Sequence, residues 1–424
     1  MTKARSLISE GVWLGCLQGF ASLGQLVGMR LLTEVLPPAV FGEFSLLLGI
    51  AVLVSTGLVN PTMQALFRYY PEYALHGNGG VVMSVARHQL IRLIARTMPL
   101  FVILGATAIA AGWASLSILC LLVALATIEM VRTKHTTMLN AIRVHRLAGS
   151  WAAFESWGRP FVAYLIVLWI GASVTGVLLG FVLASIISWM IMRRFTHYQR
   201  AHSVSRVEED ALISRFWRYT LPLLPLGIIG WISGMADRYM IGVLLSPADV
   251  GLYVAIYGLA SRPMLIFGAI VESIIRPVYL NSLVAGEYRR AHGYLKIWTL
   301  LIIFGSIVAF VLTWLGHDWL AHVMLGAQYR SVSYLLPWIV VGYAFLILSY
   351  VANRVCYANE ATRSIFMIEI IGAVLALVSG YLLIRWMGLV GAAVAIPIYY
   401  GGQLVMALLL ARRWIENDRK LSAR

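Results

Sequence analysis

Residues 334–352, YLLPWIVVGYAFLILSYVA, contain no charged side chain. A bilayer core takes about 20 apolar residues for each helix that crosses it. Eleven further predominantly apolar runs, several with one or more charged residues, lie at residues 12–36, 44–66, 93–112, 115–131, 151–170, 175–192, 219–245, 251–275, 296–315, 365–385 and 390–411. Long runs of this kind favour helices over the short alternating segments of a barrel. The sequence therefore predicts an all-α polytopic membrane protein with about twelve transmembrane helices.

The composition supports the same class. Of the 424 residues, 60% are hydrophobic and 12% are charged, with a mean hydropathy of +0.83. A water-soluble globule could not bury that much apolar surface. The net charge of +15 comes without a basic stripe interleaved with stacking aromatic residues, so we expect no nucleic-acid partner.

The basic residues predict the orientation. About 27 of the 33 Lys and Arg fall in alternate connections and at the two termini, whereas the opposite connections hold only Arg330 and Arg385. Positive residues gather on the cytoplasmic side of membrane proteins. We therefore expect both termini in the cytoplasm and an even number of spans.

A repeat divides the chain into halves. The segment Pro38-Ala39-Val40-Phe41-Gly42-Glu43-Phe44 recurs as Pro247-Ala248-Asp249-Val250-Gly251-Leu252-Tyr253. The sequence predicts an N-terminal lobe over 1–195, a cytoplasmic linker over 196–218 and a C-terminal lobe over 219–424. Each lobe has an even number of spans, so the two six-helix bundles are expected to be related by a pseudo-two-fold axis along the membrane normal.

Charged side chains inside the spans are the candidate site residues, because a mid-membrane Arg or Asp costs about 2.5–3.5 kcal/mol on insertion scales. Asp237 and Arg238 lie in one predicted span, and Arg262 lies in the next, immediately before Pro263. Arginine offers several fixed donors that match the paired oxygens of a diphosphate. We expect these residues to bind substrate. The alternative is an ion pair between Asp237 and Arg262 that only joins two helices.

Three further pairs have opposite charges four residues apart, on one helical face. They are Arg30 with Glu34, Glu155 with Arg159, and Glu272 with Arg276. The first could line the outer wall of a cavity, with Arg30 as a fourth substrate-binding residue and Glu34 as a gate or ion-coupling residue, or be an interfacial pair. The other two, toward the cytoplasmic side, could form an inner gate or simply clamp helix ends.

Glu129 and Glu369 lie near the inner ends of two spans without an obvious partner in the sequence. A carboxylate left unpaired in the membrane could carry a coupling proton. Pairing with arginines of the connections is the alternative.

These patterns resemble the oligosaccharide flippase branch of the multidrug/oligosaccharidyl-lipid/polysaccharide exporter (MOP) superfamily, the O-antigen translocases. The resemblance covers the whole chain. Its carriers are Pro38-x-x-x-Gly42-x-Phe44, Asp237-Arg238, Val250-Gly251-x-Tyr253, Leu325-Gly326-x-x-Tyr329, Leu336-Pro337 and Gly388-x-x-Gly391-Ala392-Ala393. It implies that the chain moves a polyprenyl-diphosphate-linked oligosaccharide across a bacterial inner membrane by alternating access. It also implies lipids, polysaccharide polymerase and other assembly proteins as partners.

Other classes fit less well. The chain lacks a phosphate-binding glycine-rich loop and a metal-ligand spacing, so we expect no cofactor or metal, and a proton or sodium gradient remains as the energy source. A multidrug exporter of the same fold would need carboxylates without competing arginines for a cationic cargo. A major-facilitator transporter would carry an acidic-basic turn motif between Arg68 and Arg96 that is absent. A polymerase or ligase generally carries a large outer loop, so we do not expect an enzyme.

Overall fold

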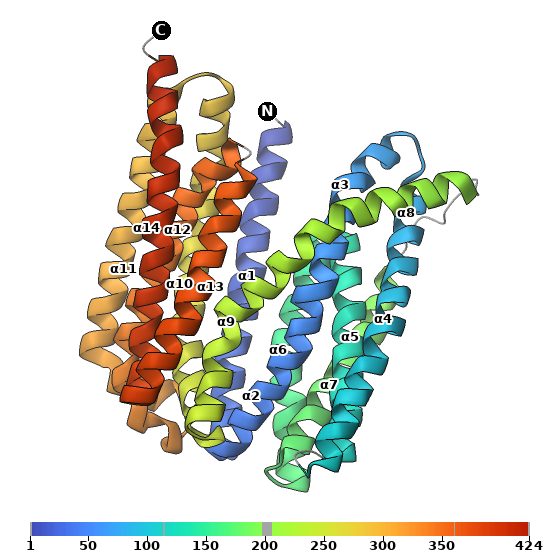
Figure 1. Cartoon of the computed structure of the whole chain (residues 1–424), viewed down its shortest axis with the longest axis vertical. Helices are drawn as coiled ribbons and strands as arrows, with labels where there is room; N and C mark the ends of the chain where they lie inside the picture. The colour runs from blue at the N-terminus through green and yellow to red at the C-terminus, as the bar shows by residue number, and fades with distance from the viewer. Residues whose placement is uncertain (1, 113–114, 197–205, 360, 423–424) are drawn as a thin grey trace. The chain divides into compact units, whose positions relative to one another are not determined.

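The computed structural model describes residues 2–112, 115–196, 206–359 and 361–422, and these contain helices but no strands (Figure 1). The α-helices are α1 (Thr2–Val35), α2 (Pro38–Leu53), α3 (Asn60–Leu75), α4 (Gly79–Ala110), α5 (Leu116–Ala141), α6 (His145–Ile170), α7 (Val174–Phe195), α8 (Arg206–Thr220), α9 (Leu224–Leu244), α10 (Pro247–Val284), α11 (Tyr288–Met324), α12 (Leu336–Ala358), α13 (Thr362–Met387) and α14 (Leu389–Ser422). Shorter helical segments, a π-helical turn (Val54–Val59) and 3₁₀ turns (Leu221–Leu223 and Ala327–Leu335), join some of them.

The prediction of twelve helical spans is confirmed. The π-helical turn joins α2 to α3, and 3₁₀ turns join α8 to α9 and lead into α12. With these joined, the described residues form twelve helical segments, of which ten are long and apolar enough to cross a membrane. The two others are α1 and α6, and α6 carries the charged side chains of Glu155 and Arg159.

Several helices continue well past the predicted end of the apolar run. Helix α5 ends at Ala141 instead of near residue 131, and α12 ends at Ala358 instead of near residue 352. Residues expected in cytoplasmic connections, Arg132 and Arg354 among them, are therefore helical. Arg132 pairs with Glu129 of the same helix, and Arg354 pairs with Glu272 of α10.

Two compact units emerge from the contacts. Unit 1 comprises Met1–Leu36 and Glu43–Trp231, and unit 2 comprises Pro37–Gly42 and Ile232–Arg424. Helices α2 and α9 each contribute residues to both units.

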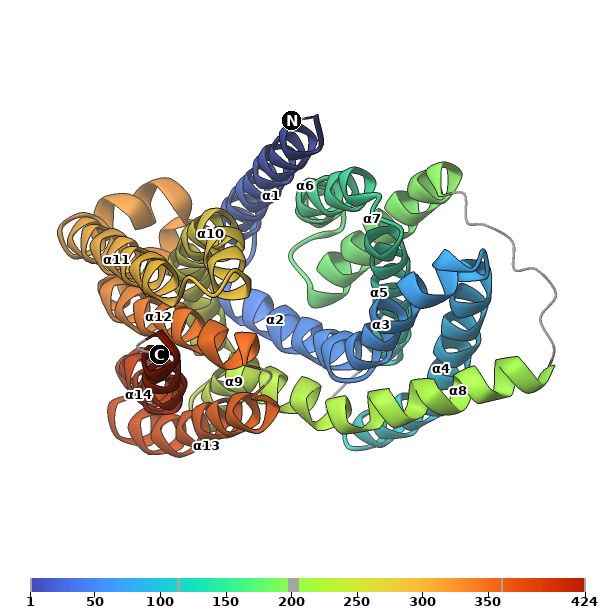
Figure 2. The ribbon, with the colours of Figure 1, turned by 90° about the horizontal axis from the view of Figure 1, so that it is seen from above.

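Most of the predicted linker belongs to unit 1. Residues 197–205 of it lie outside the described part of the chain, and residues from Arg206 onward form α8. This helix lies against α3 and α4 (Figure 2). Leu212 and Phe216 are buried in that contact, and Arg215 pairs with Glu72 at 3.2 Å.

In unit 1, α1 packs along α6 because small residues let the two helices approach. A side chain at Gly24 would overlap the ring of Trp157, and one at Gly28 would overlap Pro160. The Nε1 of Trp157 donates a 3.0 Å hydrogen bond to the carbonyl of Phe20, and the two rings stack. Helix α6 in turn packs on α7 and α5, and so its charged residues face the interior of the bundle.

In unit 2, the two copies of the repeated motif contact each other. A Cβ at Gly42 would overlap the carbonyl oxygen of Pro247, and a Cβ at Gly251 would overlap that of Pro38. The first turns of α2 and α10 therefore cross at backbone contact, each glycine against the proline carbonyl of the other copy. This reciprocal contact explains why the repeat retains Pro-x-x-x-Gly.

Candidate functional site

The interior of unit 1 holds a cluster of four charged side chains, which we call the unit 1 ion cluster: Glu129 and Arg132 of α5 with Glu155 and Arg159 of α6. Glu129 contacts both guanidinium groups at 2.5 Å. Glu155 lies 3.3 Å from Arg132 and 3.4 Å from Arg159, and it accepts a 2.9 Å hydrogen bond from Trp151 Nε1. Both carboxylates are buried.

This cluster bears on two expectations from the sequence, that Glu129 has no partner and that Glu155 pairs with Arg159. Glu129 is not unpaired, because α5 continues past the predicted end of the span and brings Arg132 back one turn later. Its second partner, Arg159, comes from the neighbouring helix. The predicted pairing of Glu155 with Arg159 is present, but inside a four-membered network and not as an isolated clamp.

A cavity of about 420 Å³ adjoins this cluster within unit 1. It is lined by residues of α2, the π-helical turn, α3, α5, α6 and α7: Leu48, Val52, Ser55, Thr56, Asn60, Glu129, Arg132, Thr133, Thr136, Thr137, Arg159 and Phe181. π-Helical turns occur frequently at functional sites. Here the turn places Ser55 and Thr56 on the wall of the same cavity as the charged residues of α5.

A second cluster lies in unit 2, in the spans where the sequence predicts substrate contacts. Asp237 of α9 accepts a 2.6 Å hydrogen bond from the hydroxyl of Tyr253 and a 2.8 Å bond from the backbone N–H of Arg238. The guanidinium of Arg238 lies over the ring of Tyr257, 5.2 Å from its centre. Its buried Nε has no hydrogen-bond partner.

Arg262 of α10 is half-buried and lies close enough to Arg238 and Tyr343 to interact with both electrostatically. The structure therefore brings together Asp237, Arg238 and Arg262, three of the four residues predicted to bind substrate. Two guanidiniums and one carboxylate leave this cluster with an excess of one positive charge. The predicted role in binding substrate stays a prediction.

Tyrosines lie around this cluster, and no pattern in the sequence predicted their position. Tyr343 of α12 donates a 2.6 Å hydrogen bond to the hydroxyl of Tyr257, and its ring packs edge-on against both Tyr257 and Tyr400. Tyr399 of α14 packs on Tyr400. All four rings are buried. They come from three helices far apart in sequence, so local periodicity could not place them together.

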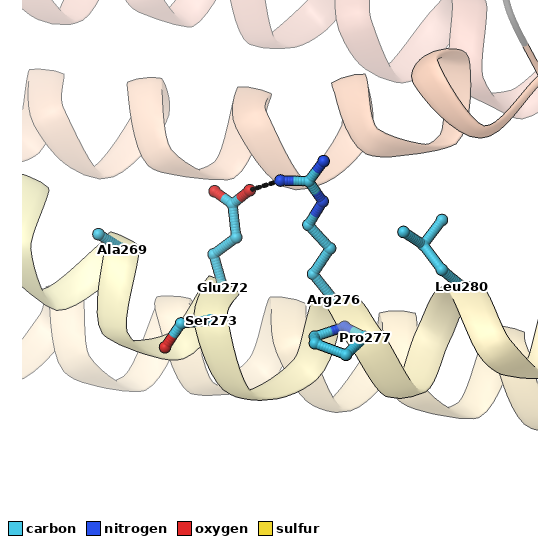
Figure 3. A pocket seen from close by; sticks show the side chains of 6 residues that line it. All are labelled: Ala269, Glu272, Ser273, Arg276, Pro277 and Leu280. Atoms are coloured by element: carbon cyan, nitrogen blue, oxygen red, sulfur yellow. Dashed lines mark hydrogen bonds and ion pairs between the residues drawn. The ribbon is translucent and has the colours of Figure 1, made fainter. Parts of the chain in front are cut away.

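A third group lies further along α10. Glu272 is 3.3 Å from Arg276, one turn away on the same helix as predicted (Figure 3). It is also 2.6 Å from Arg354 of α12. A pocket of about 520 Å³ is lined by α10 alone, through Ala269, Glu272, Ser273, Arg276, Pro277 and Leu280 (Figure 3). The group again holds two guanidiniums and one carboxylate. Arg354 was missed because the sequence placed it in a connection.

The remaining candidates have simpler surroundings. Arg30 and Glu34 form the predicted pair at 2.8 Å, and both are partly exposed on α1. Glu369 of α13 accepts a weak 3.4 Å hydrogen bond from the amide of Gln403. Within the described residues, no group of three or more His, Cys, Asp or Glu is arranged to hold a metal ion.

Comparison with solved structures relates this arrangement of helices to known transporters. A multidrug resistance MATE family transporter of the MOP superfamily, in an inward-facing conformation, superposes with a TM-score of 0.72 at 14% identity over 96% of each chain. The lipid II flippase MurJ, in an inward closed conformation, gives 0.71 at 13% identity over 95% of this chain and 87% of that one. The chain has the fold of these transporters. A MOP superfamily transporter from Pyrococcus furiosus, described as having a binding pocket of reverse polarity, gives 0.61 at 15% identity over 97% and 95% of the two chains.

No protein-family model and no curated protein sequence matches the chain. At these low identities the likeness establishes the fold of a multi-pass membrane transporter and not its cargo.

Proposed function

We propose that this protein moves a polyprenyl-diphosphate-linked oligosaccharide from the cytoplasmic to the outer leaflet of a bacterial inner membrane, for O-antigen or exopolysaccharide assembly. Its termini lie in the cytoplasm in this proposal. Its partners are the lipid-linked oligosaccharide, the surrounding lipids, and the polymerase and other assembly proteins that use the product.

The observation that carries the proposal is the excess of arginine in the spans of unit 2. Arg238 and Arg262 lie close to each other, with the carboxylate of Asp237 beside Arg238, and Arg276 and Arg354 both pair with Glu272. An excess of positive charge inside the membrane is costly, so an anionic ligand stabilises it. Arg238 also has a buried Nε that a phosphate oxygen would satisfy.

The fold supports this reading, since one of the similar structures is a flippase for lipid II. It equally accommodates a multidrug exporter, the second candidate, because other similar structures are MATE transporters. The charge excess argues against a cationic drug as cargo, since both arginine groups would repel it. An enzyme is not proposed, because the similar structures are transporters.

The test is transport by purified protein in vesicles, with a fluorescent polyprenyl-diphosphate saccharide and, separately, a fluorescent cationic drug. Arg238→Ala, Arg238→Lys, Arg262→Ala and Arg262→Lys are compared with Arg290→Ala, which changes an exposed arginine of α11. We expect each of the four to lower transport of the lipid about tenfold or more, because a hydrogen bond to a charged group is worth about 1.5–3 kcal/mol. Full transport in all four variants would reject the diphosphate contact, and transport of the drug alone would favour the exporter.

The same vesicles test the energy source that we propose, a proton or sodium gradient. Glu369 is the better of the two proton-carrier candidates, because its described partner is a neutral amide whereas Glu129 is held by two arginines. We expect Glu369→Gln to abolish the response of transport to an imposed pH gradient. An unchanged response would exclude this residue.

A further inference from the structure

The cavity in unit 1 is not explained by a diphosphate site. Its polar wall includes Glu129, Arg132 and Arg159 of the unit 1 ion cluster, in which two carboxylates and two guanidiniums compensate each other. We propose that this cavity is a carbohydrate subsite, which binds a neutral sugar ring of the cargo. The assignment of the ligand as part of the cargo rests on the proposed function.

Charge balance favours a neutral ligand over an ion. An added anion would have to compete with Glu129 and Glu155 for Arg132 and Arg159, and an added cation would compete for the carboxylates. Breaking a buried ion pair leaves an uncompensated charge and is strongly unfavourable. A ligand without charge can bind at the edge of the network and leave it intact.

The wall offers both donors and acceptors, as hydroxyl-rich ligands require. The Nε of Arg159 is buried and has no hydrogen-bond partner, so it is an available donor. Thr56 and Ser55 donate their hydroxyl hydrogens to the carbonyl of Val52, at 2.7 and 3.0 Å. Thr136 likewise donates to the carbonyl of Arg132, at 3.1 Å. A hydroxyl has one hydrogen and two lone pairs, so these three are left to accept bonds on the cavity wall.

The rest of the wall suits the apolar face of a sugar ring. Leu48 and Val52 of α2 and Phe181 of α7 line the cavity beside the polar residues. A cavity of about 420 Å³ falls within the range of about 300–1,000 Å³ found for small-molecule sites. An inorganic ion would not fill it. A ring with one apolar face and hydroxyls around its edge matches the composition of this wall.

The binding test uses the full-length purified protein and two probes. The first is the oligosaccharide that mild acid releases from the lipid-linked saccharides of the source cells, labelled at its reducing end. The second is inorganic diphosphate. Three variants change the cavity: Thr136→Phe fills it, Thr136→Val removes one acceptor at similar volume, and Arg159→Lys keeps the charge but removes Nε. Thr107→Phe is the matched control, since Thr107 is exposed on α4 and makes the same kind of hydrogen bond to its own helix.

We expect the three cavity variants to weaken oligosaccharide binding by about tenfold or more, as loss of a hydrogen bond or of space would require, with Thr107→Phe unchanged. Diphosphate binding should be unchanged in them and weakened by Arg238→Ala. Thermal unfolding identifies any variant that fails to fold, and Thr136→Val and Arg159→Lys still decide the result if Thr136→Phe does. The proposal is overturned if the oligosaccharide does not bind, if the folded cavity variants bind it as tightly as the unchanged protein, or if they lose only diphosphate.

The two proposals can fail separately. Sugar binding at this cavity without transport of the lipid-linked saccharide would reject the flippase function and leave the subsite in place. Transport that depends on Arg238 but not on the cavity residues would reject the subsite alone.

Discussion

Glu129 is the side chain whose environment the structure defines most completely. It holds Arg132 and Arg159 together, and both its partners lose their shortest contact if it is removed. We expect Glu129→Ala to destabilise the protein by about 3–5 kcal/mol, as measured for removal of one partner from buried pairs. Unfolding of the purified protein in mixed micelles measures this. Glu287→Ala, which removes an exposed carboxylate paired with Arg290, is the control and should change little.

A double variant separates charge imbalance from loss of packing. Adding Arg132→Ala to Glu129→Ala leaves Glu155 with Arg159, one carboxylate to one guanidinium. We expect the double variant to be more stable than Glu129→Ala alone. Losses that simply add would show that the charges do not act as a network.

For single residues, the sequence predicts contacts between side chains of the same helix and misses contacts between side chains of different helices. Pairs four residues apart, such as Glu272 with Arg276, form as expected because helical geometry alone brings them together. The second partner of Glu272, Arg354, comes from another helix. The tyrosines around Arg238 were missed for the same reason, since they gather from α10, α12 and α14.

Among the helices, the crossing of α2 and α10 depends on two glycines. We expect Gly42→Ala or Gly251→Ala to force the first turns of these helices apart, because a Cβ at either position overlaps a proline carbonyl. The cost should be about 1–3 kcal/mol, as for overpacked cores. Gly19→Ala in α1 is the matched control, since a Cβ there meets nothing within 4 Å. It should be neutral or stabilising because alanine favours helix. Equal effects of all three substitutions on thermal unfolding would contradict the close crossing.

The number of helices was predictable because each span needs its own apolar run to cross the lipid. The ends of the helices were not predictable, since hydropathy falls where the membrane ends and not where the helix ends. Helices α5 and α12 continue past that point into polar sequence. The repeated Pro-x-x-x-Gly motif was visible in the sequence, but only the structure shows that its two copies contact each other.

For the molecule as a whole, the charge bias predicts which ends of the helices face the cytoplasm. Two positions at opposite ends of α11 test it: Glu287, immediately before the helix, and Asp318, near its other end. With the three native cysteines replaced, Asp318→Cys should react with an impermeant thiol reagent in intact cells, because its side chain is largely exposed and its end of α11 is predicted to face outward. Glu287→Cys should react only after the membrane is permeabilised. Since each crossing reverses the direction of the chain, the opposite pattern would invert the orientation of every helix and place the termini outside. The pocket lined by Glu272 lies toward the end of α10 that leads to Glu287. A flippase that receives its cargo from cytoplasmic enzymes needs the first pattern, because only then does this end of α10 face the cytoplasm.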